Sequence, residues 1–189
     1  MIYVLASASP RRRELLALLG IPFEVHAPNV EERLDPAWTA AQAARALARQ
    51  KAAAAARDFP GDCVIAADTI VEIDGILLGK PTDAAGAARM LRLLSGREHR
   101  VITGVCLRRG EDERVFSQES LVRFYGLSDE EIGAYVRTGE PMDKAGAYGI
   151  QGRGALLAEG ITGDYFNVVG LPAARLAREL KSFIGEGSF

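Results

Sequence analysis

The sequence predicts an α/β fold built on a mixed, twisted sheet. Three observations support this prediction. Helix-type and strand-type segments alternate along the chain. Residues 62–73 form an apolar, β-branched run, which is typical of a central strand buried on both faces. Two turn signals, Asp74-Gly75 and Gly110-Glu111-Asp112, each separate a pair of strand-type segments, so they predict antiparallel hairpins.

The first twenty residues predict a short strand, a turn and a helix. Ser9 is placed to cap the helix, Pro10 suits its first position and Gly20 suits its end, with four leucines between 15 and 19 as the apolar face. The basic run 11–13 is unusual, because the first turn of a helix favours anions and leaves backbone N–H groups free. A phosphate chain would match this turn, and a solvated basic turn is the alternative.

The other elements follow from periodicity and from capping residues. In chain order we expect a strand at 23–27, a loop at 28–36, an alanine-rich helix from Thr39 to about 57, the strand 62–73 with its return strand 76–78, a helix from 82 or 83 to 94, the strands 99–108 and 114–125, a helix from the Ser128 capping box to about 139, a glycine-rich loop 140–154, a strand 155–159, a loop 163–172 and a closing helix 173–184.

Composition places the chain among globular proteins. Its 189 residues, 48% hydrophobic and 25% charged, suit a single domain over 1–189. The net charge of −2 argues against general nucleic-acid binding. The chain has no apolar run of membrane-spanning length and no secretory signal, so we expect a cytoplasmic protein with no membrane partner. Cys63 and Cys106 are expected to be buried free thiols.

Acidic residues in two segments are candidates for chemistry. Asp68 interrupts an apolar strand, where a carboxylate is costly unless it is paired, hydrogen-bonded or bound to a metal. Thr69 should point to the opposite face of that strand. Glu31 and Glu32 form a second acidic site, which with Asp68 and a triphosphate would hold Mg²⁺ or Mn²⁺. The alternatives are a hydrogen bond from Asp68 to a turn and solvated loop charges at 31–32.

Several lysines could meet phosphate. Lys80 follows a strand in a tight turn, and Lys51 and Lys144 have similar standing, with plain surface positions as the alternative. His26 and His99 lack metal-ligand spacing, and the chain contains no G-x-S-x-G, P-loop or G-x-G-x-x-G motif. Hydrolysis of a nucleotide phosphoanhydride would fit this set of residues. The carboxylates could bind a metal ion, and the basic side chains and the start of the first helix could bind phosphate.

Eight motifs, in order along essentially the whole chain, resemble the Maf family of nucleoside triphosphate pyrophosphatases. They are Leu5-Ala6-Ser7-Ala8-Ser9-Pro10-Arg11-Arg12, Ala67-Asp68-Thr69-Ile70-Val71, Gly79-Lys80-Pro81, Leu94-Ser95-Gly96 with His99, Thr103-Gly104-Val105, Gly139-Glu140, Asp143-Lys144-Ala145-Gly146-Ala147-Tyr148-Gly149-Ile150-Gln151-Gly152, and Asn167-Val168-Val169-Gly170-Leu171-Pro172.

The resemblance implies an elongated mixed sheet in two lobes around a cleft, related to inosine triphosphate pyrophosphatases. It implies metal-dependent cleavage between the α and β phosphates of a nucleoside triphosphate. Asp68 matches the proposed proton acceptor and, with Glu32, a metal ligand. The phosphate-binding positions of the family match Ser7, Arg11, Arg12, Lys51 and Lys80.

The resemblance also indicates the branch that acts on dTTP and UTP, which Arg11, Thr69 and Gln151 mark. This branch is associated with removal of modified pyrimidine nucleotides, and the family was named for effects on septum formation. The resemblance leaves room for a homodimer. Two alternatives remain open: a nucleotide-binding regulator of cell division without turnover, and a purine-directed pyrophosphatase.

Overall fold

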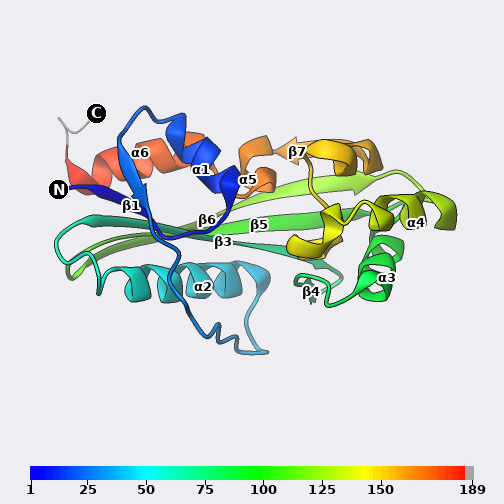
Figure 1. Ribbon diagram of the computed structural model, residues 1–189, viewed down its shortest axis with the longest axis horizontal. Coiled ribbons are helices and arrows are strands. Elements are labelled where there is room, and N and C mark those ends of the chain that lie inside the picture. Colours follow the sequence, from blue (N-terminus) through cyan, green and yellow to red (C-terminus); the bar gives the residue numbers. More distant parts are fainter. Residues whose placement is uncertain (186–189) are drawn as a thin grey trace.

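One mixed sheet runs the length of the molecule (Figure 1). In the computed structural model, which describes residues 1–185, seven strands form this sheet in the order β2-β1-β3-β5-β6-β7, and β4 also pairs with β3. The pairs β1–β2 and β1–β3 are parallel and the others are antiparallel. The strands are β1 (Tyr3–Leu5), β2 (Phe23–Val25), β3 (Cys63–Ile73), β4 (Ile76–Leu78), β5 (Glu98–Arg109), β6 (Asp112–Phe124) and β7 (Ala158–Gly163).

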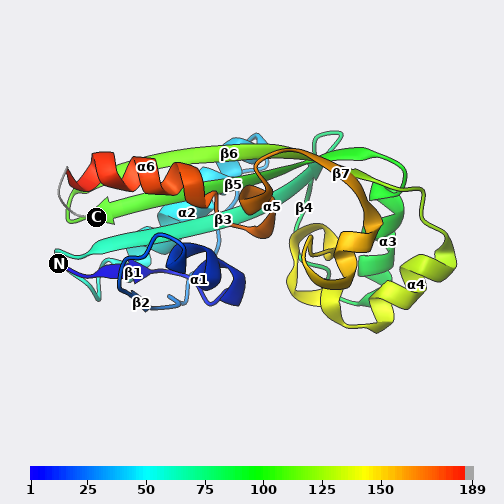
Figure 2. The same ribbon diagram turned by 90° about the horizontal axis from the view of Figure 1, so that it is seen from above.

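Helices cover both faces of the sheet. Figure 1 shows α2 below the three long strands, and α1, α5 and α6 above them, while α3 and α4 lie at the end away from both termini. The three short 3-10 helices of residues 140–157 belong to this far end as well, where the view from above shows this part of the chain coiled beside α3 and α4 (Figure 2). The helices are α1 (Pro10–Ala17), α2 (Ala40–Ala55), α3 (Ala84–Leu94), α4 (Asp129–Arg137), η1 (Glu140–Asp143), η2 (Ala145–Ala147), η3 (Gly152–Leu157), α5 (Tyr165–Val169) and α6 (Ala173–Ile184).

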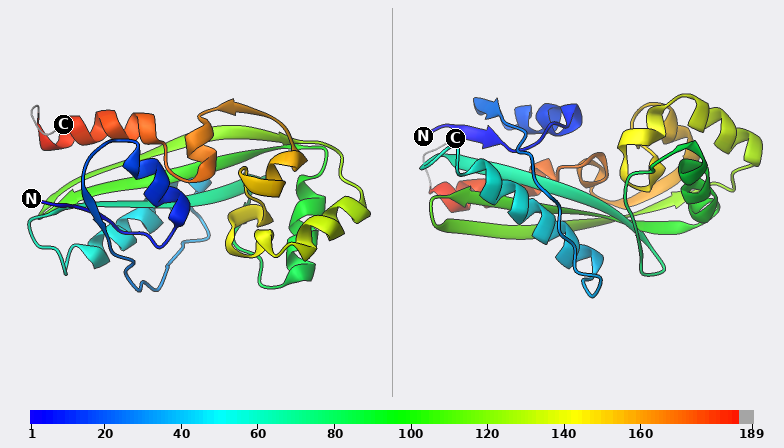
Figure 3. Two further views of the ribbon diagram at one scale, coloured as in Figure 1. Left: turned by 45° about the horizontal axis from the view of Figure 1, so that its top comes forward. Right: turned by 60° about the horizontal axis from the view of Figure 1, so that its bottom comes forward.

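The hydrophobic core is divided between the two ends of the sheet, which form two lobes (Figure 3). At one end, Leu5 and Ile65 pack with Leu16 of α1 and Leu176 of α6. At the other end, Val71 and the ends of β5 and β6 pack against α3, α4 and η2. The strands β3, β5 and β6 contribute to both cores. The α/β architecture predicted from the sequence is therefore confirmed.

α2 lies unusually close to the sheet. Its alanines at 48, 52 and 55 are fully buried against Val64 and Cys106. The closest approach is at Gly104 of β5, where an added Cβ would lie 2.3 Å from both the carbonyl carbon and the carbonyl oxygen of Ala44. The alanine run of α2 thus allows close helix–sheet packing. At Gly104 the backbone of α2 itself contacts the sheet, so α2 cannot move closer to β5.

A gap in strand pairing lies at the middle of β3. On one edge, β3 pairs with β5 continuously from Val64 to Glu72. On its other edge, β1 pairs with residues 63–65 and β4 with residues 71–73. Between those two strands, residues 66–70 have no strand partner on that edge within the part of the chain that the structure describes. Asp68 lies at the centre of this gap.

Two predicted elements near the C-terminus were wrong. Residues 155–159 were expected to form a strand, but η3 continues to Leu157 and β7 begins only at Ala158. The cause is the Glu140 carboxylate, which accepts hydrogen bonds from the backbone at 153 and 154 and keeps this segment curled. The expected loop at 163–172 contains α5, whose N-terminus is capped by the carboxylate of Asp164.

The opening segment largely follows the prediction. Ser9 caps α1 by accepting a hydrogen bond from Arg12 N, and Pro10 is the first helical residue. The helix ends at Ala17, earlier than expected. Leu18 was expected on the apolar face but is 63% exposed.

Cys63 and Cys106 are buried free thiols, as predicted, and burial raises the pKa of each to about 12. Among residues 1–185, no helix has the length and apolar character that crossing a membrane would need.

Candidate active site

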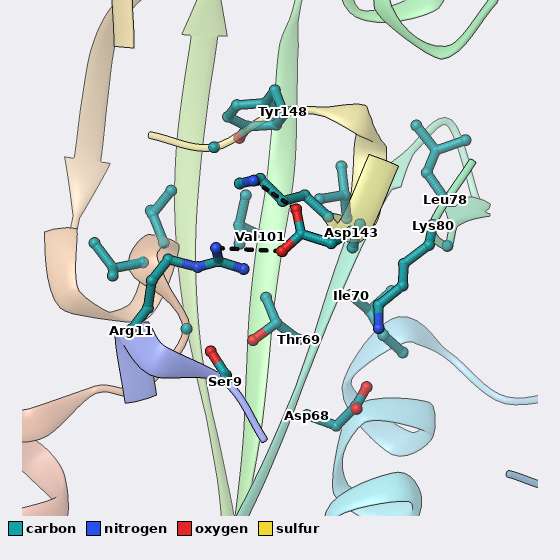
Figure 4. A pocket seen from close by; sticks show the side chains of 18 of the residues that line it. Ser9, Arg11, Asp68, Thr69, Ile70, Leu78, Lys80, Val101, Asp143 and Tyr148 are labelled. Carbon is teal, nitrogen blue, oxygen red and sulfur yellow. Dashed lines mark hydrogen bonds and ion pairs between the residues drawn. The ribbon is translucent and has the colours of Figure 1, made fainter. Parts of the chain in front are cut away.

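A cleft of about 450 Å³ lies over the unpaired edge of β3, between the two lobes. It is lined by the start of α1, by β3, by the end of β4 and by the segment 143–151 (Figure 4). Most of the residues that the sequence singled out line it together. These residues are Arg11, Arg12, Glu32, Lys51, Asp68, Thr69, Lys80, Lys144 and Gln151.

The acidic part of the cleft is organised by one lysine. Lys51 Nζ forms an ion pair with the Asp68 carboxylate and lies 2.9 Å from Glu32 Oε1. The Asp68 and Lys51 side chains are only 13% and 19% exposed. Glu31 instead forms an ion pair with Arg33 in solvent. The structure therefore brings Glu32, and not Glu31, to the same cation as Asp68.

Arg12 holds three segments together behind the cleft. Its Nε donates to the carbonyl oxygen of Gly170 at 2.8 Å, its Nη2 to Thr69 Oγ1 at 3.0 Å and its Nη1 to Ser7 Oγ at 3.4 Å. Burial lowers the pKa of Arg12, and the charge of Asp68 opposes this effect. Three of its five N–H groups are used in this way, which leaves two for a ligand. Ser7 is buried and supports Arg12, and it is not part of the cleft lining.

Thr69 points away from Asp68, as the strand geometry predicted. Its hydroxyl lies 2.9 Å from that of Thr103, and Thr103 donates in turn to the carbonyl oxygen of Asn167. The Asn167 side chain is fully buried and bonds to the backbone of Thr103 and Val101 and to Ser120. A continuous polar chain thus connects Arg12 to α5, and it fixes Thr69 in place.

The far wall of the cleft faces Arg11. Figure 4 shows Arg11 meeting Asp143 across the cleft, and the side chain of Lys80 extending toward Asp68. Arg11 Nη1 lies 3.6 Å from Asp143 Oδ2. Lys144 Nζ donates to Asp143 Oδ1 and to the carbonyl oxygen of Glu140, both at 2.6 Å. Burial raises the pKa of Asp143, but the hydrogen bond and charge of Lys144, with Arg11, outweigh it, so the net shift is downward.

A protein-family model and several named relatives are similar in sequence to this chain along most of its length. A family model described as Maf-like protein matches residues 3–183. The chain belongs to the Maf family. The dTTP/UTP pyrophosphatase of Symbiobacterium thermophilum is 55% identical over 180 residues, 95% of this chain and 93% of the relative. That of Bacillus cytotoxicus is 52% identical over 181 residues, 96% of this chain and 95% of the relative.

A solved structure, that of the Staphylococcus aureus Ham1 protein, is also similar to the chain. The likeness covers 66% of this chain and 72% of the Ham1 chain, with 17% sequence identity and a TM-score of 0.49.

Sequence reasoning assigned no role to two groups that line the cleft of this Maf protein. Asp143 was named only as part of the glycine-rich loop and of a family motif, because its partner Arg11 lies 132 residues earlier in the chain. Tyr148 lines the cleft, and its hydroxyl shares a 2.7 Å hydrogen bond with Nε2 of the buried His99. Burial lowers the pKa of His99 to about 4, so its ring is neutral near pH 7. The glycines at 146, 149, 152 and 154 are the sequence signal that could have indicated a closely packed loop, because an added Cβ at each would lie within about 3.1 Å of another atom.

The oxygen atoms of Glu32 and Asp68 fit a hard divalent cation. Both carboxylates already converge on a single cation, the ammonium group of Lys51. Among residues 1–185, no group of three His, Cys, Asp or Glu side chains is placed to hold a metal ion. A Mg²⁺ or Mn²⁺ ion here would therefore need further oxygen ligands from phosphate and water, which is the usual way in which Mg²⁺ binds beside nucleotides.

Proposed function

We propose that this Maf protein hydrolyses dTTP and UTP to the nucleoside monophosphate and pyrophosphate. The observation that carries the proposal is the position of Asp68, a nearly buried carboxylate on an unpaired strand edge, facing basic side chains from several segments. The names of the relatives support the same substrates.

The charge of the cleft suits a triphosphate. Among the described residues that line it, five are basic and three are acidic. The basic residues are Arg11, Arg12, Lys51, Lys80 and Lys144. Arginine and lysine donors would hold the phosphate oxygens. The protein thus presents donors where negative charge develops during cleavage.

Asp68 is placed to act on water. Its carboxylate would accept a proton from a water molecule as the water oxygen bonds to the α phosphorus. The bond between that phosphorus and the α–β bridging oxygen then breaks, and pyrophosphate leaves with the electron pair. Lys51, beside Asp68, would hold the carboxylate and a phosphate oxygen in register. A divalent ion held by Glu32 and Asp68 would supply further charge stabilisation.

Arg11 and Gln151 are proposed to recognise the base. The guanidinium of Arg11 carries donors only, so it favours a carbonyl oxygen over an amino group. The amide of Gln151 both donates and accepts, so it matches the carbonyl and imide N–H of uracil or thymine. Cytosine presents an amino group at the same edge, and this difference predicts discrimination against CTP.

The test is a turnover panel with product analysis. We expect dTTP and UTP to give dTMP and UMP with pyrophosphate, activity to be lost in chelator, and Mg²⁺ or Mn²⁺ to restore it. Asp68→Asn should lower kcat by at least about 100-fold. Asp112→Asn, at the exposed first residue of β6, is the matched control and should retain full activity. Release of orthophosphate instead of pyrophosphate would refute cleavage at the α–β bond.

The same panel decides between the alternatives. Tight binding of dTTP without turnover would favour a regulator of cell division, and faster turnover of methylated or deaminated purine nucleotides would favour a purine-directed enzyme. We also propose a cytoplasmic location, a reducing compartment in which Cys63 and Cys106 stay free thiols.

A further inference from the structure

Gln151 is held in place by its loop. It precedes η3, has an extended backbone and is one of the residues that line the cleft. It belongs to no strand or helix that could fix it by ladder or helix hydrogen bonds. Its position therefore depends on whatever holds the segment 149–154.

The Glu140 carboxylate holds the C-terminal side of this segment. One carboxylate oxygen, Oε1, accepts a hydrogen bond from Gly154 N at 3.1 Å, and Oε2 accepts one from Arg153 N at 3.1 Å. The Tyr135 hydroxyl donates to Oε1 at 3.0 Å. The same hydroxyl accepts a hydrogen bond from Gly149 N at 3.1 Å. Glu140 and Tyr135 thus bind the loop backbone on both sides of Gln151, and we call this pair of side chains the clamp.

The glycines of the loop show how closely it is folded around these two groups. Gly152 has a left-handed φ of 69°, and a Cβ added there would lie 3.1 Å from Glu140 Oε2. A Cβ at Gly154 would lie 2.2 Å from the carbonyl oxygen of Gly149 and 2.6 Å from the Tyr135 hydroxyl. The loop backbone therefore folds closely around Glu140 and the Tyr135 hydroxyl. Neither position 152 nor position 154 has space for a side chain.

Glu140 contributes to this clamp and not to the chemistry in the cleft. Its carboxylate bonds to backbone amides and a tyrosine, and the residue is not part of the cleft lining. A charged acceptor makes stronger hydrogen bonds to backbone N–H groups than a neutral one does. The Glu140 carbonyl oxygen also accepts from Lys144, which bonds to Asp143, the partner of Arg11. One set of contacts therefore leads from Gln151 to Arg11 on the other side of the cleft.

We infer that Glu140 is a positioning residue for base recognition: with the Tyr135 hydroxyl, it fixes the loop that presents Gln151 to the pyrimidine. This inference rests on the proposed function, in which Gln151 recognises uracil or thymine. Glu140 acts through Gln151 and does not touch the substrate. Its loss should therefore affect affinity and base selectivity, and leave the phosphate chemistry in place.

The first test uses Glu140→Gln. A glutamine has one acceptor and one donor group, so in either orientation its NH₂ faces an N–H or O–H donor of the clamp. We expect the KM for UTP to rise about ten-fold, kcat to stay within about three-fold, and the preference for UTP over CTP to fall toward that of Gln151→Ala. Glu159→Gln, at an exposed position on β7, is the matched control and should behave as wild type.

A double variant separates positioning from general damage. Because Glu140 acts through Gln151, adding Glu140→Gln to Gln151→Ala should reduce the UTP preference no further. Additive losses, or a lower kcat with unchanged selectivity, would overturn the inference.

A second measurement needs no turnover. In the free protein, hydrogen exchange at Arg153 and Gly154 should become at least about ten-fold faster in Glu140→Gln, and exchange at Gly149 should do so in Tyr135→Phe. Unchanged protection in these variants overturns the inference even in an active enzyme. A wild-type chain that does not hydrolyse UTP or dTTP would instead refute the proposed function, and calorimetric affinities for UTP and CTP would then replace KM in the comparison.

Discussion

Gly104→Ala should displace α2 and disturb the site through it. The new Cβ would lie 2.3 Å from the carbonyl carbon and oxygen of Ala44, so α2 or β5 must move by about 1 Å to reach ordinary contact at 3.4 Å. Overpacking of this kind costs about 1–3 kcal/mol, and we expect the upper end because both partners are backbone in regular elements. The lower entropy of the unfolded alanine chain offsets about 0.5 kcal/mol.

The net loss of about 2.5 kcal/mol should lower Tm by roughly 5–10 °C in a chain of this size. Urea unfolding should show a lower midpoint with an unchanged slope. Gly126→Ala is the matched control, because its Cβ would meet nothing within 4 Å and its backbone is not left-handed. A Tm within about 2 °C of wild type for Gly104→Ala would refute the packing argument.

A second variant tests which atoms collide. The contact is with the carbonyl group of Ala44, so Ala44→Gly should not relieve it and should add the cost of a glycine in a helix, about 1 kcal/mol. Rescue of Gly104→Ala by Ala44→Gly would contradict the reasoning. Activity should fall as well, because Gly104 is the ladder partner of Asp68 and α2 carries Lys51.

Three further predictions concern charge and burial. Asp143→Asn should raise the KM for UTP by about two- to five-fold, since an exposed ion pair contributes at most about 1 kcal/mol; a rise beyond about ten-fold would contradict a merely orienting contact with Arg11. The pKa of His99 is about 4 in the fold against 6.5 unfolded, so the unfolded state binds the extra proton between these values. Stability should therefore fall by about 3 kcal/mol as pH drops from 6.5 to 4, and His99→Gln should flatten this slope in urea titrations; equal slopes would refute it. Cys63 and Cys106 should resist a thiol reagent at pH 8 until the chain is unfolded, and rapid labelling of native protein would contradict their burial.

The elements with strong local signals could be predicted from the sequence. The caps Ser9, Thr39 and Ser128 begin helices where the sequence placed them, and the long apolar run around Asp68 is the central strand. These features are local, because capping and side-chain alternation act within a few residues.

Features that depend on distant partners could not be predicted. η3 replaced an expected strand because Glu140 bonds to its amides, and a contact of this kind leaves no periodic pattern in the sequence. The pairing of Arg11 with Asp143 joins two charges 132 residues apart in the chain, and no local pattern shows which acidic residue Arg11 will meet. For the cleft, the sequence indicated most of the residues that line it, but it included Ser7, which lies behind the cleft, and gave no role to Asp143 and Tyr148. The sequence did not show that Lys51 lies between Glu32 and Asp68; only the structure shows this contact.

The three long strands β3, β5 and β6 enter both hydrophobic cores, so the two lobes cannot be separated by cutting the chain at one point. No linker separates the lobes in the described chain, because β3, β5 and β6 pass through each of them. A single cut in the turn between β5 and β6 would leave each fragment with part of both cores, so neither lobe is a folding unit that could be inherited or exchanged alone. The cleft therefore lies against strands that both lobes share, so a change in the packing of either lobe can reach Asp68 through β3 itself.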